Sequence, residues 1–263
     1  MTLHALESAA FAAWPALDEA VLAGWRVRHA DGYTQRANSA NATAAAAPLD
    51  DALVGAIEAA YRARGRPAIF RLASLTEHVE ADDRRLADLG YRFCDVSLVM
   101  TRRLDGSDDS PDGREADGAR PSTSMAMRRA TLDTAPDAAA WLAAYRAITG
   151  ASGPGQDTHL RMLQAIRGAT AYGWHRDPAR AIACALAVAQ DGLLGLFDVA
   201  THVDHRRAGL STQLCHGLMA WGRVRGATQA YLQVVAANAN AIRLYERLGF
   251  RRAYHYWYRV ATA

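Results

Sequence analysis

Residues 193–224 read LLGLFDVATHVDHRRAGLSTQLCHGLMAWGRV. The apolar residues that begin this stretch, from Leu193 to about His202, predict a buried strand. Further on, apolar residues recur at helical spacing from Leu210 to Val224 and predict an amphipathic helix. A strand followed by a loop and the start of a helix is an arrangement in which backbone N–H groups can bind an anion. The sequence therefore predicts an anion site in the loop before Leu210.

The loop of this predicted anion site reads DHRRAGLS, from Asp204 to Ser211. Gly209 has no Cβ, so the backbone can come close to a phosphate there. Arg206 and Arg207 add permanent positive charge to the partial charge of the helix N-terminus. The alternative is an ordinary surface loop with solvated arginines, and residues further along the chain decide between the two.

Further elements of the C-terminal part are predicted from the same kinds of pattern. We expect helices near 136–148, 157–167 and 240–248, the first with Asp133 or Thr134 near its cap. We expect strands at 125–131, 169–175, 180–189 and 229–235, and an alternating aromatic strand through Tyr254, Tyr256 and Tyr258. Together these elements predict an α+β fold, a mixed and mostly antiparallel sheet flanked by helices.

The chain also shows signs of two related halves. Residues 104–124, LDGSDDSPDGREADGARPSTS, have the composition of a linker and separate residues 1–103 from residues 125–263. Leucines and an isoleucine precede Gly65 at the intervals at which leucines precede Gly226. GRPAIFRLA in the first half resembles GATQAYLQVV in the second, and RRLADLGYR resembles RLYERLGFR. These matches occur in the same order, which favours a duplication.

Composition excludes several classes of function. The chain has 263 residues, 51% of them hydrophobic and 22% charged, as in a folded globular protein. All 30 basic residues are arginine, so a Schiff-base lysine and a phosphate loop of the G-K-S/T kind are excluded. The three cysteines lie far apart, which argues against a disulfide framework and a paired-cysteine zinc site, and we expect no metal.

The charge and hydropathy patterns bear on partners and location. A net charge of +3 with interspersed acids gives little support to nucleic-acid binding. Acidic residues interrupt the N-terminal apolar residues, and the longest apolar run, from Ala181 to Ala189, is too short to cross a bilayer. We therefore expect a cytoplasmic protein that binds neither nucleic acid nor membrane.

The R-x-x-G-x-S pattern of residues 206–211 is followed, after one predicted helix and one strand, by NANAIRLYERLGF at 238–250. This combination resembles the acyl-CoA signature of the GNAT superfamily of N-acetyltransferases, with Ser211 where the pattern usually has Gly or Ala. The resemblance covers Met125 to Val260. It implies acetyl-CoA as cosubstrate, a small-molecule or peptide amine as acceptor, and a monomer or homodimer.

Carried over residue by residue, the resemblance also assigns roles. Backbone groups of three strand residues would pair with pantetheine: Val199, Ala200 and Thr201. The loop and helix start would hold the pyrophosphate: Arg206, Arg207, Ala208, Gly209, Leu210 and Ser211. Asn238 would border the cofactor, and Tyr245 would be the general acid that protonates the leaving thiolate, a role that suits a phenol. The alternative for Tyr245 is a ring that packs on the sheet, and both roles can coexist.

The general base is less well marked. Asp198 is the only acid on its predicted strand and stands among apolar residues, which makes it a candidate base or a structural hydrogen-bonding residue. His202 and His205 are further titratable residues near the loop, with solvated loop positions as the alternative. Cys215 is predicted to be a buried, inert thiol.

The first half lacks the corresponding features. Residues Ala45 to Asp50 align with the predicted anion loop, but both arginines are replaced by alanine, and Pro48 has no N–H to donate. Leu86 aligns with Tyr245 and carries no proton to give. In the polar stretch 32–39, Arg36 and Asn38 could reach a substrate. The sequence thus predicts an N-acetyltransferase with an inactive N-terminal half; the alternatives are a non-catalytic acyl-CoA sensor or scaffold and an interaction module.

Overall fold

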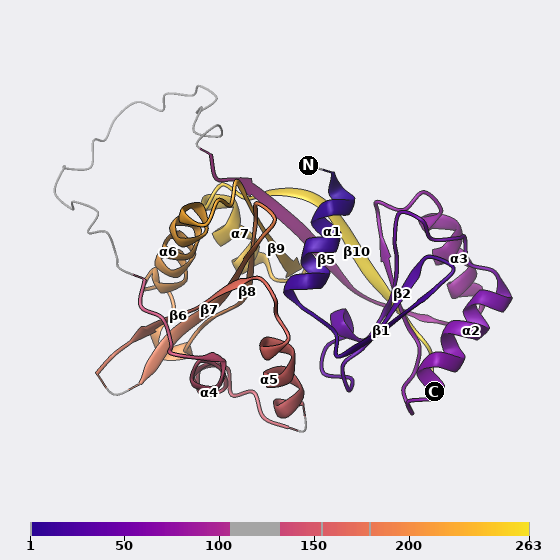
Figure 1. Cartoon of the computed structure of the whole chain (residues 1–263), viewed down its shortest axis with the longest axis horizontal. Helices are drawn as coiled ribbons and strands as arrows, with labels where there is room; N and C mark the ends of the chain where they lie inside the picture. The colour runs from indigo at the N-terminus through magenta and orange to yellow at the C-terminus, as the bar shows by residue number, and fades with distance from the viewer. Residues whose placement is uncertain (1, 106–131, 154, 179, 263) are drawn as a thin grey trace. The chain divides into compact units, whose positions relative to one another are not determined.

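The computed structural model describes residues 2–105, 132–153, 155–178 and 180–262 (Figure 1). The predicted strand 125–131 and nearly all of the predicted linker 104–124 lie outside these residues. The chain forms two compact units. Unit 1 contains residues 1–101, 151–168 and 232–263, and unit 2 contains residues 102–150 and 169–231. These units differ in their bounds from the two sequence halves, whose duplication stays a prediction.

Unit 1 contains these helices and strands: α1 (Leu3–Ala13), β1 (Asp18–Leu22), β2 (Trp25–His29), η1 (Gln35–Ala37), β3 (Ala40–Ala42), α2 (Asp51–Arg62), β4 (Ile69–Ala73), α3 (Val79–Asp88), β5 (Arg92–Arg103, as far as residue 101), α5 (Gln156–Gln164), α7 (Ala239–Arg247) and β10 (Arg251–Val260). Its strands follow the order β1-β2-β3-β4-β10-β5. Adjacent strands are antiparallel except β3 and β4, which are parallel.

The last strand of the chain completes the sheet of unit 1. β10 lies between β4 and β5 and pairs antiparallel with both, with Trp257 opposite Leu72 and Tyr256 opposite Ser97. The Arg259 guanidinium and the Trp257 indole both donate to Asp83 of α3, at 2.8 Å and 2.6 Å. The N-terminal half therefore depends on a strand that follows it by about 150 residues in the sequence.

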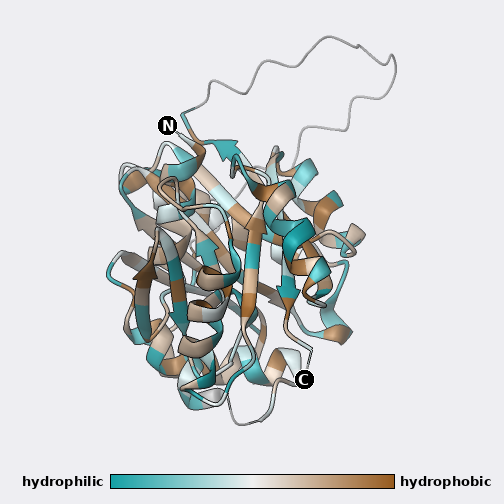
Figure 2. Ribbon diagram, turned by 90° about the vertical axis from the view of Figure 1, so that its right-hand side faces the viewer, coloured by the Kyte–Doolittle hydropathy of each residue, from teal (hydrophilic) through white to brown (hydrophobic). Residues whose placement is uncertain are grey.

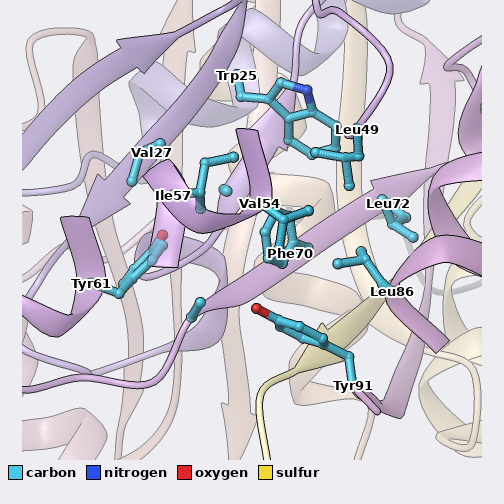
Figure 3. Close-up of a cluster of buried hydrophobic side chains, with 12 residues drawn as sticks. Trp25, Val27, Leu49, Val54, Ile57, Tyr61, Phe70, Leu72, Leu86 and Tyr91 are labelled. Carbon is cyan, nitrogen blue, oxygen red and sulfur yellow. The ribbon is translucent and has the colours of Figure 1, made fainter. Parts of the chain in front are cut away.

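The core of unit 1 lies between α2, α3 and this sheet (Figure 3). Phe70 of β4 is fully buried, and its ring meets the rings of Trp25 and Tyr91 edge to face, with centroids 5.9 Å and 5.4 Å apart. Leu49, just before α2, and Ile57 of α2 both lie in this cluster. Figure 2 shows helices with hydrophobic and hydrophilic residues on the same helix, as expected for helices with one buried face.

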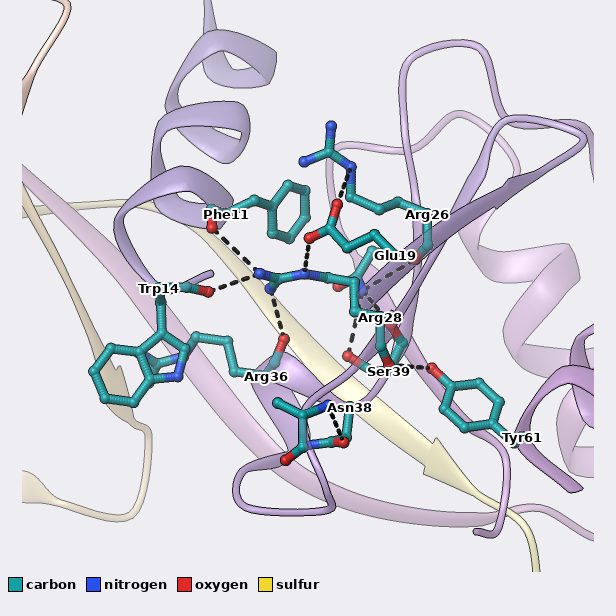
Figure 4. Close-up of polar contacts among 11 residues, drawn as sticks. Phe11, Trp14, Glu19, Arg26, Arg28, Arg36, Asn38, Ser39 and Tyr61 are labelled. Carbon is teal, nitrogen blue, oxygen red and sulfur yellow. Dashed lines mark hydrogen bonds and ion pairs between the residues drawn. The ribbon is translucent and has the colours of Figure 1, made fainter. Parts of the chain in front are cut away.

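A fully buried arginine joins α1 to β2 (Figure 4). The Arg28 guanidinium donates to the carbonyl oxygens of Phe11 and Trp14 at the end of α1, at 3.2 Å and 2.7 Å. It also donates to the carbonyl oxygen of Arg36 and, from Nε, to the Glu19 carboxylate, both at 2.8 Å. One side chain thus satisfies carbonyl groups at a helix end that the helix itself leaves without partners.

Unit 2 contains α4 (Ala138–Thr149), the antiparallel strands β6 (Ala169–Arg176), β7 (Ala181–Gln190) and β8 (Leu193–Thr201), η2 (Val203–His205) and α6 (Leu210–Val224). β9 (Gln229–Val235) passes from unit 2 into unit 1 after Tyr231. The predicted helices and strands among the described residues are confirmed within a few residues, as is the α+β class. The cap of α4 was predicted wrongly: Asp137, not Asp133 or Thr134, accepts the N–H of Ala140 at 2.8 Å.

Candidate active site

Strand β8 is irregular where the sequence predicts the catalytic centre. The pairing of β7 with β8 shifts register between Cys184–Ala200 and Leu186–Phe197, and Asp198 stands in this bulge with a φ of 48°. A bulge bends a strand and interrupts the regular ladder of hydrogen bonds. The residues of β8 before the bulge are buried, whereas Val199, Ala200 and Thr201 are half-buried. The bulge therefore begins a stretch of strand that remains accessible.

The predicted anion loop follows directly. Arg207 and Gly209 have left-handed φ angles of 66° and 78°, and α6 begins at Leu210 with neither a side-chain cap nor an acidic residue in its first turn. Among the described residues, the N–H groups of Arg207, Ala208, Gly209 and Leu210 donate to no protein acceptor. Helix N-termini with free N–H groups and no carboxylate attract anions.

The side chains around the loop leave this backbone open. Arg206 and Arg207 are exposed, and the Arg206 Nε donates to the carbonyl oxygen of Thr201 at 3.4 Å. The Thr201 and Ser211 hydroxyls lie 2.8 Å apart, so Ser211 makes a local contact in place of the usual Gly or Ala. A Cβ added at Gly209 would find its nearest neighbour 3.9 Å away, at Gln213 Nε2, so the space beside this glycine is open. These residues fit the diphosphate of a coenzyme A molecule.

Asn238 and Tyr245 belong to unit 1, whereas the anion loop and Asp198 belong to unit 2. The Asn238 side chain caps α7 by accepting the N–H of Ala241 at 3.1 Å. Tyr245 is 8% exposed, and its ring meets that of Phe250 with centroids 6.1 Å apart. Both residues therefore have structural roles in α7. The Tyr245 ring packs against Phe250, which agrees with the alternative of a packing role for this residue. Their functional assignments stay predictions.

The other titratable candidates occupy distinct environments. Burial, with a contribution from the nearby Asp198 carboxylate, raises the pKa of the Cys184 thiol. Burial raises the pKa of Cys215 to about 12, so this thiol holds little of the nucleophilic thiolate, as predicted for an inert cysteine. His202 Nδ1 lies 3.4 Å from the Asp204 carboxylate, and the His202 and His205 rings are 5.9 Å apart beside the loop.

The aligned loop in the N-terminal half has its N–H groups occupied. Ala46 and Ala47 donate to the carbonyl oxygens of Thr43 and Ala23, at 3.0 Å and 2.9 Å. Leu49 donates to the buried Asp82 carboxylate at 2.8 Å. Asp50 caps α2 by accepting the N–H of Leu53 at 2.7 Å. The donors that would bind an anion are therefore used within the protein, and a carboxylate stands at the helix start.

Two further residues differ from expectation. Asn38, predicted as able to reach a substrate, is 7% exposed, and its amide bonds to backbone groups of Ala30, Gly32 and Thr34. Gln233 of β9 received no role from the sequence, yet its Oε1 accepts a hydrogen bond from Tyr256 at 2.8 Å. An amide in the otherwise apolar run YLQVV was the signal that could have identified Gln233.

The fold, the strand bulge and the open helix start agree with the GNAT class of acyltransferases, and the comparisons with known proteins show this family. The chain belongs to the family described as "Probable histone acetyltransferase Rv0428c C-terminal", whose model matches residues 2–259. This match spans both halves, whereas the signature read from the sequence covered only the second.

Individual relatives agree with this assignment. The chain is 31% identical over 272 residues to the probable histone acetyltransferase Rv0428c of Mycobacterium tuberculosis, covering 99% of this chain and 74% of that protein. It is 25% identical to the uncharacterized N-acetyltransferase YobR of Bacillus subtilis, covering 98% of each.

Solved structures share the fold. A GCN5-related N-acetyltransferase from Kribbella flavida superposes with a TM-score of 0.68 at 19% identity, covering 99% of this chain and 95% of that one. A tandem GNAT protein from the clavulanic acid biosynthesis pathway superposes with a TM-score of 0.54 at 14% identity, covering 81% of this chain and 70% of that one. Within the described ranges, no helix is long and apolar enough to cross a membrane, and no three His, Cys, Asp or Glu side chains group as metal ligands.

Proposed function

We propose that this protein is an acetyl-CoA-dependent N-acetyltransferase that acts on the primary amine of a small molecule or peptide. The observation that carries the proposal is the row of N–H groups from Arg207 to Leu210, which have no protein acceptor among the described residues. Two exposed arginine side chains, at 206 and 207, stand beside them. This combination of free donors and positive charge suits a diphosphate.

Different residues of the chain bind different parts of acetyl-CoA in this proposal. Arg206 to Ser211 hold the diphosphate, and the accessible backbone of Val199, Ala200 and Thr201 pairs with the pantetheine arm. Asn238 borders the cofactor from the start of α7. Acetyl-CoA supplies a thioester carbonyl as electrophile, and backbone N–H groups near the bulge are suited to stabilise negative charge that develops on its oxygen.

Two side chains handle protons in this proposal. The Tyr245 phenol donates a proton to the departing thiolate, because a phenol and a thiol have ordinary pKa values within about two units of each other. Asp198 is the candidate that accepts a proton from the attacking amine, directly or through water. The N-terminal half binds no cofactor. The chain contains two GNAT-like halves in tandem. The protein acts in the cytoplasm as a monomer or homodimer.

The test is release of CoA from acetyl-CoA with a panel of amines, comparing wild type with Tyr245→Phe. We expect kcat to fall roughly 100-fold or more, as on loss of a general acid, while calorimetric affinity for acetyl-CoA is unchanged. Tyr172→Phe, at a half-buried tyrosine of β6, is the control and should keep full turnover. Unchanged turnover in Tyr245→Phe would remove Tyr245 from the mechanism. Binding of acetyl-CoA without turnover for any amine would favour the acyl-CoA sensor instead.

A further inference from the structure

Unit 1 contains a cavity of about 320 Å³ beside the C-terminal end of α2. A cavity of this volume is large enough for a small ligand. The loop that aligns with the cofactor loop, residues 45–50, precedes the other end of α2, so the cavity is not the counterpart of that loop. Its charged and titratable lining residues come from β1, β2, the loop after β2, the segment after α2, and α5: Asp18, His29, Asp31, Arg64, Arg66 and Arg161.

Arginines outnumber carboxylates around this cavity. Asp18 accepts a hydrogen bond from Arg64, and Asp31 Oδ2 accepts one from Arg161 Nη1 at 3.0 Å. Arg66 has no carboxylate partner among the described residues, and its Nη2 donates to the carbonyl oxygen of Asp31 at 2.6 Å. The cavity lining therefore contains one positive charge that no carboxylate of the described chain pairs with.

The loop after β2 positions two of these arginines. A Cβ added at Gly32 would lie 2.7 Å from Arg66 Nη1, so the absence of a side chain there makes room for the guanidinium. Asp31 Oδ2 accepts hydrogen bonds from the Thr158 hydroxyl, at 2.8 Å, and from Arg161, both of α5. Since Arg66 donates to the carbonyl oxygen of the same aspartate, Asp31 brings together arginines that are far apart in the sequence.

A buried histidine without a hydrogen-bond partner also lines the cavity. His29 is 7% exposed, and its Nε2 is buried without a partner. Its Nδ1 has no protein partner within the described ranges and is not a buried atom, so Nδ1 is the ring nitrogen that a ligand can reach. By contrast, the amide of Asn38, another buried residue of the lining, bonds to several backbone groups. Buried polar side chains normally have partners, so His29 indicates a site that a ligand completes.

The protonation of His29 is consistent with this interpretation. Burial and the charge of Arg64 lower the pKa of His29, although the Asp18 carboxylate opposes them. The imidazole is therefore neutral at pH 7 and carries one N–H donor. A proton on Nδ1 leaves Nε2 as the buried acceptor and gives the cavity a donor.

We propose that this cavity binds a small organic dianion, a dicarboxylate or a phosphate monoester, through Arg66, Arg161 and His29. Guanidinium groups match the oxygens of carboxylates and phosphates in geometry and charge. Donors without a protein acceptor in the described part of the chain remain on Nε and Nη1 of Arg66 and on Nε and Nη2 of Arg161. Two arginines from separate elements favour a dianion over a monoanion. All the named residues belong to unit 1, so the proposal does not depend on the proposed acetyl transfer.

The test is calorimetric titration with succinate and with glycerol 3-phosphate, at an ionic strength kept constant with potassium chloride. We expect wild type to bind at least one of these dianions, and acetate at least about tenfold more weakly. Arg66→Gln should weaken binding of the dianion at least about fivefold, because charged hydrogen bonds are lost. Arg66 is exposed, so this substitution should leave the fold intact.

A second variant and a second measurement address His29. His29→Phe keeps a ring beside Tyr61, where the two ring centroids are 4.7 Å apart, but removes the donor. This variant should weaken binding about threefold or more. The His29 ring signal in the NMR spectrum, assigned by its absence from His29→Phe, should shift when wild type is titrated with the dianion.

Arg62→Gln is the matched control, because Arg62 ends α2 with its side chain 75% exposed, lies 3.5 Å from Glu58 and is not a lining residue. It should keep the wild-type affinity, as should the double variant Arg206→Gln/Arg207→Gln in the predicted anion loop of unit 2. Wild type that binds neither dianion, or affinity that Arg66→Gln leaves unchanged, would overturn the inference. Binding that is lost in the double variant would also overturn it, because the dianion would then be held by the cofactor loop.

Discussion

At the scale of single residues, arginine side chains form hydrogen bonds in the interior of the protein as well as on its surface. Arg28 and Arg71 are both buried: the Arg28 guanidinium donates to acceptors from several elements, and that of Arg71 makes two hydrogen bonds with the Glu7 carboxylate of α1. A planar group with five N–H donors suits such sites, because one side chain can satisfy a carboxylate and several carbonyls together. Burial lowers the pKa of Arg28, and the adjacent Glu19 carboxylate opposes that change.

The Glu7–Arg71 pair predicts a pH-dependent stability. Burial by itself would raise the pKa of Glu7, but the Arg71 charge and hydrogen bonds outweigh it and hold the pKa below its ordinary value of 4.5. A depressed folded-state pKa stabilises the fold above pH 4.5, and this contribution is lost as pH falls through the lower folded value. Glu7→Gln should therefore cost roughly 3–5 kcal/mol of unfolding free energy at pH 7. The difference from wild type should shrink below pH 4.5.

Urea unfolding at several pH values measures this difference. Glu246→Gln is the control, because Glu246 is 48% exposed and lies 3.7 Å from Arg252, a surface pair worth about 1 kcal/mol or less. If Glu7→Gln lowered the free energy of unfolding by the same amount at pH 7 and at pH 3, the assignment of Glu7 and Arg71 as a charged pair would be contradicted.

Local features that depend on neighbours in the sequence were predictable, and contacts between distant strands were not. The loop and helix start at Gly209 were predicted because they are local patterns. Gln233 and Arg71 were missed, since their partners Tyr256 and Glu7 lie 23 and 64 residues away. Asn38 was misjudged for a related reason: a polar residue in a polar stretch gives no sign that backbone groups will bury it.

At the scale of elements, hydrophobic periodicity predicted the helices and strands of the C-terminal part closely, including β9 with its observed bounds. Periodicity does not specify which strands pair. β10 lies between β4 and β5, although both belong to the first half of the sequence. The linker-based division into residues 1–103 and 125–263 therefore does not describe the compact units, because unit 1 takes in residues 151–168 and 232–263 as well.

This strand placement predicts that residues 1–103 do not fold alone. Without β10, both β4 and β5 lose a hydrogen-bonded neighbour, and Asp83 loses its partners Arg259 and Trp257. We expect fragment 1–103 to show no cooperative thermal transition by circular dichroism. The same fragment joined through a Gly/Ser linker to residues 250–263 should regain one. A cooperative transition in the unextended fragment would contradict this dependence.

At the scale of the whole molecule, the two halves repeat an order of helix, strand, helix and strand: α2, β4, α3 and β5 in the first, and α6, β9, α7 and β10 in the second. Their helix starts differ in chemistry. The start of α2 is capped by Asp50, and the loop before it donates its N–H groups to protein acceptors. The start of α6 has neither a side-chain cap nor an acidic residue. The same order of elements thus contains one helix start with open N–H groups and one whose N–H groups have protein acceptors.

The whole chain should therefore bind one molecule of acetyl-CoA, and Gly209→Ala should weaken that binding at least about fivefold. Gly209 has a φ of 78°, where a Cβ costs roughly 1 kcal/mol or more, and the strain falls on the backbone that faces the diphosphate. Gly226→Ala is the matched control, because Gly226 has a φ of 82° just past the other end of α6 and no neighbour within 4 Å of an added Cβ. Both variants should lose similar stability by urea unfolding, but only Gly209→Ala should lose affinity by calorimetry. Two binding events per chain, or equal affinity loss in both variants, would show that the α6 loop is not the sole cofactor site.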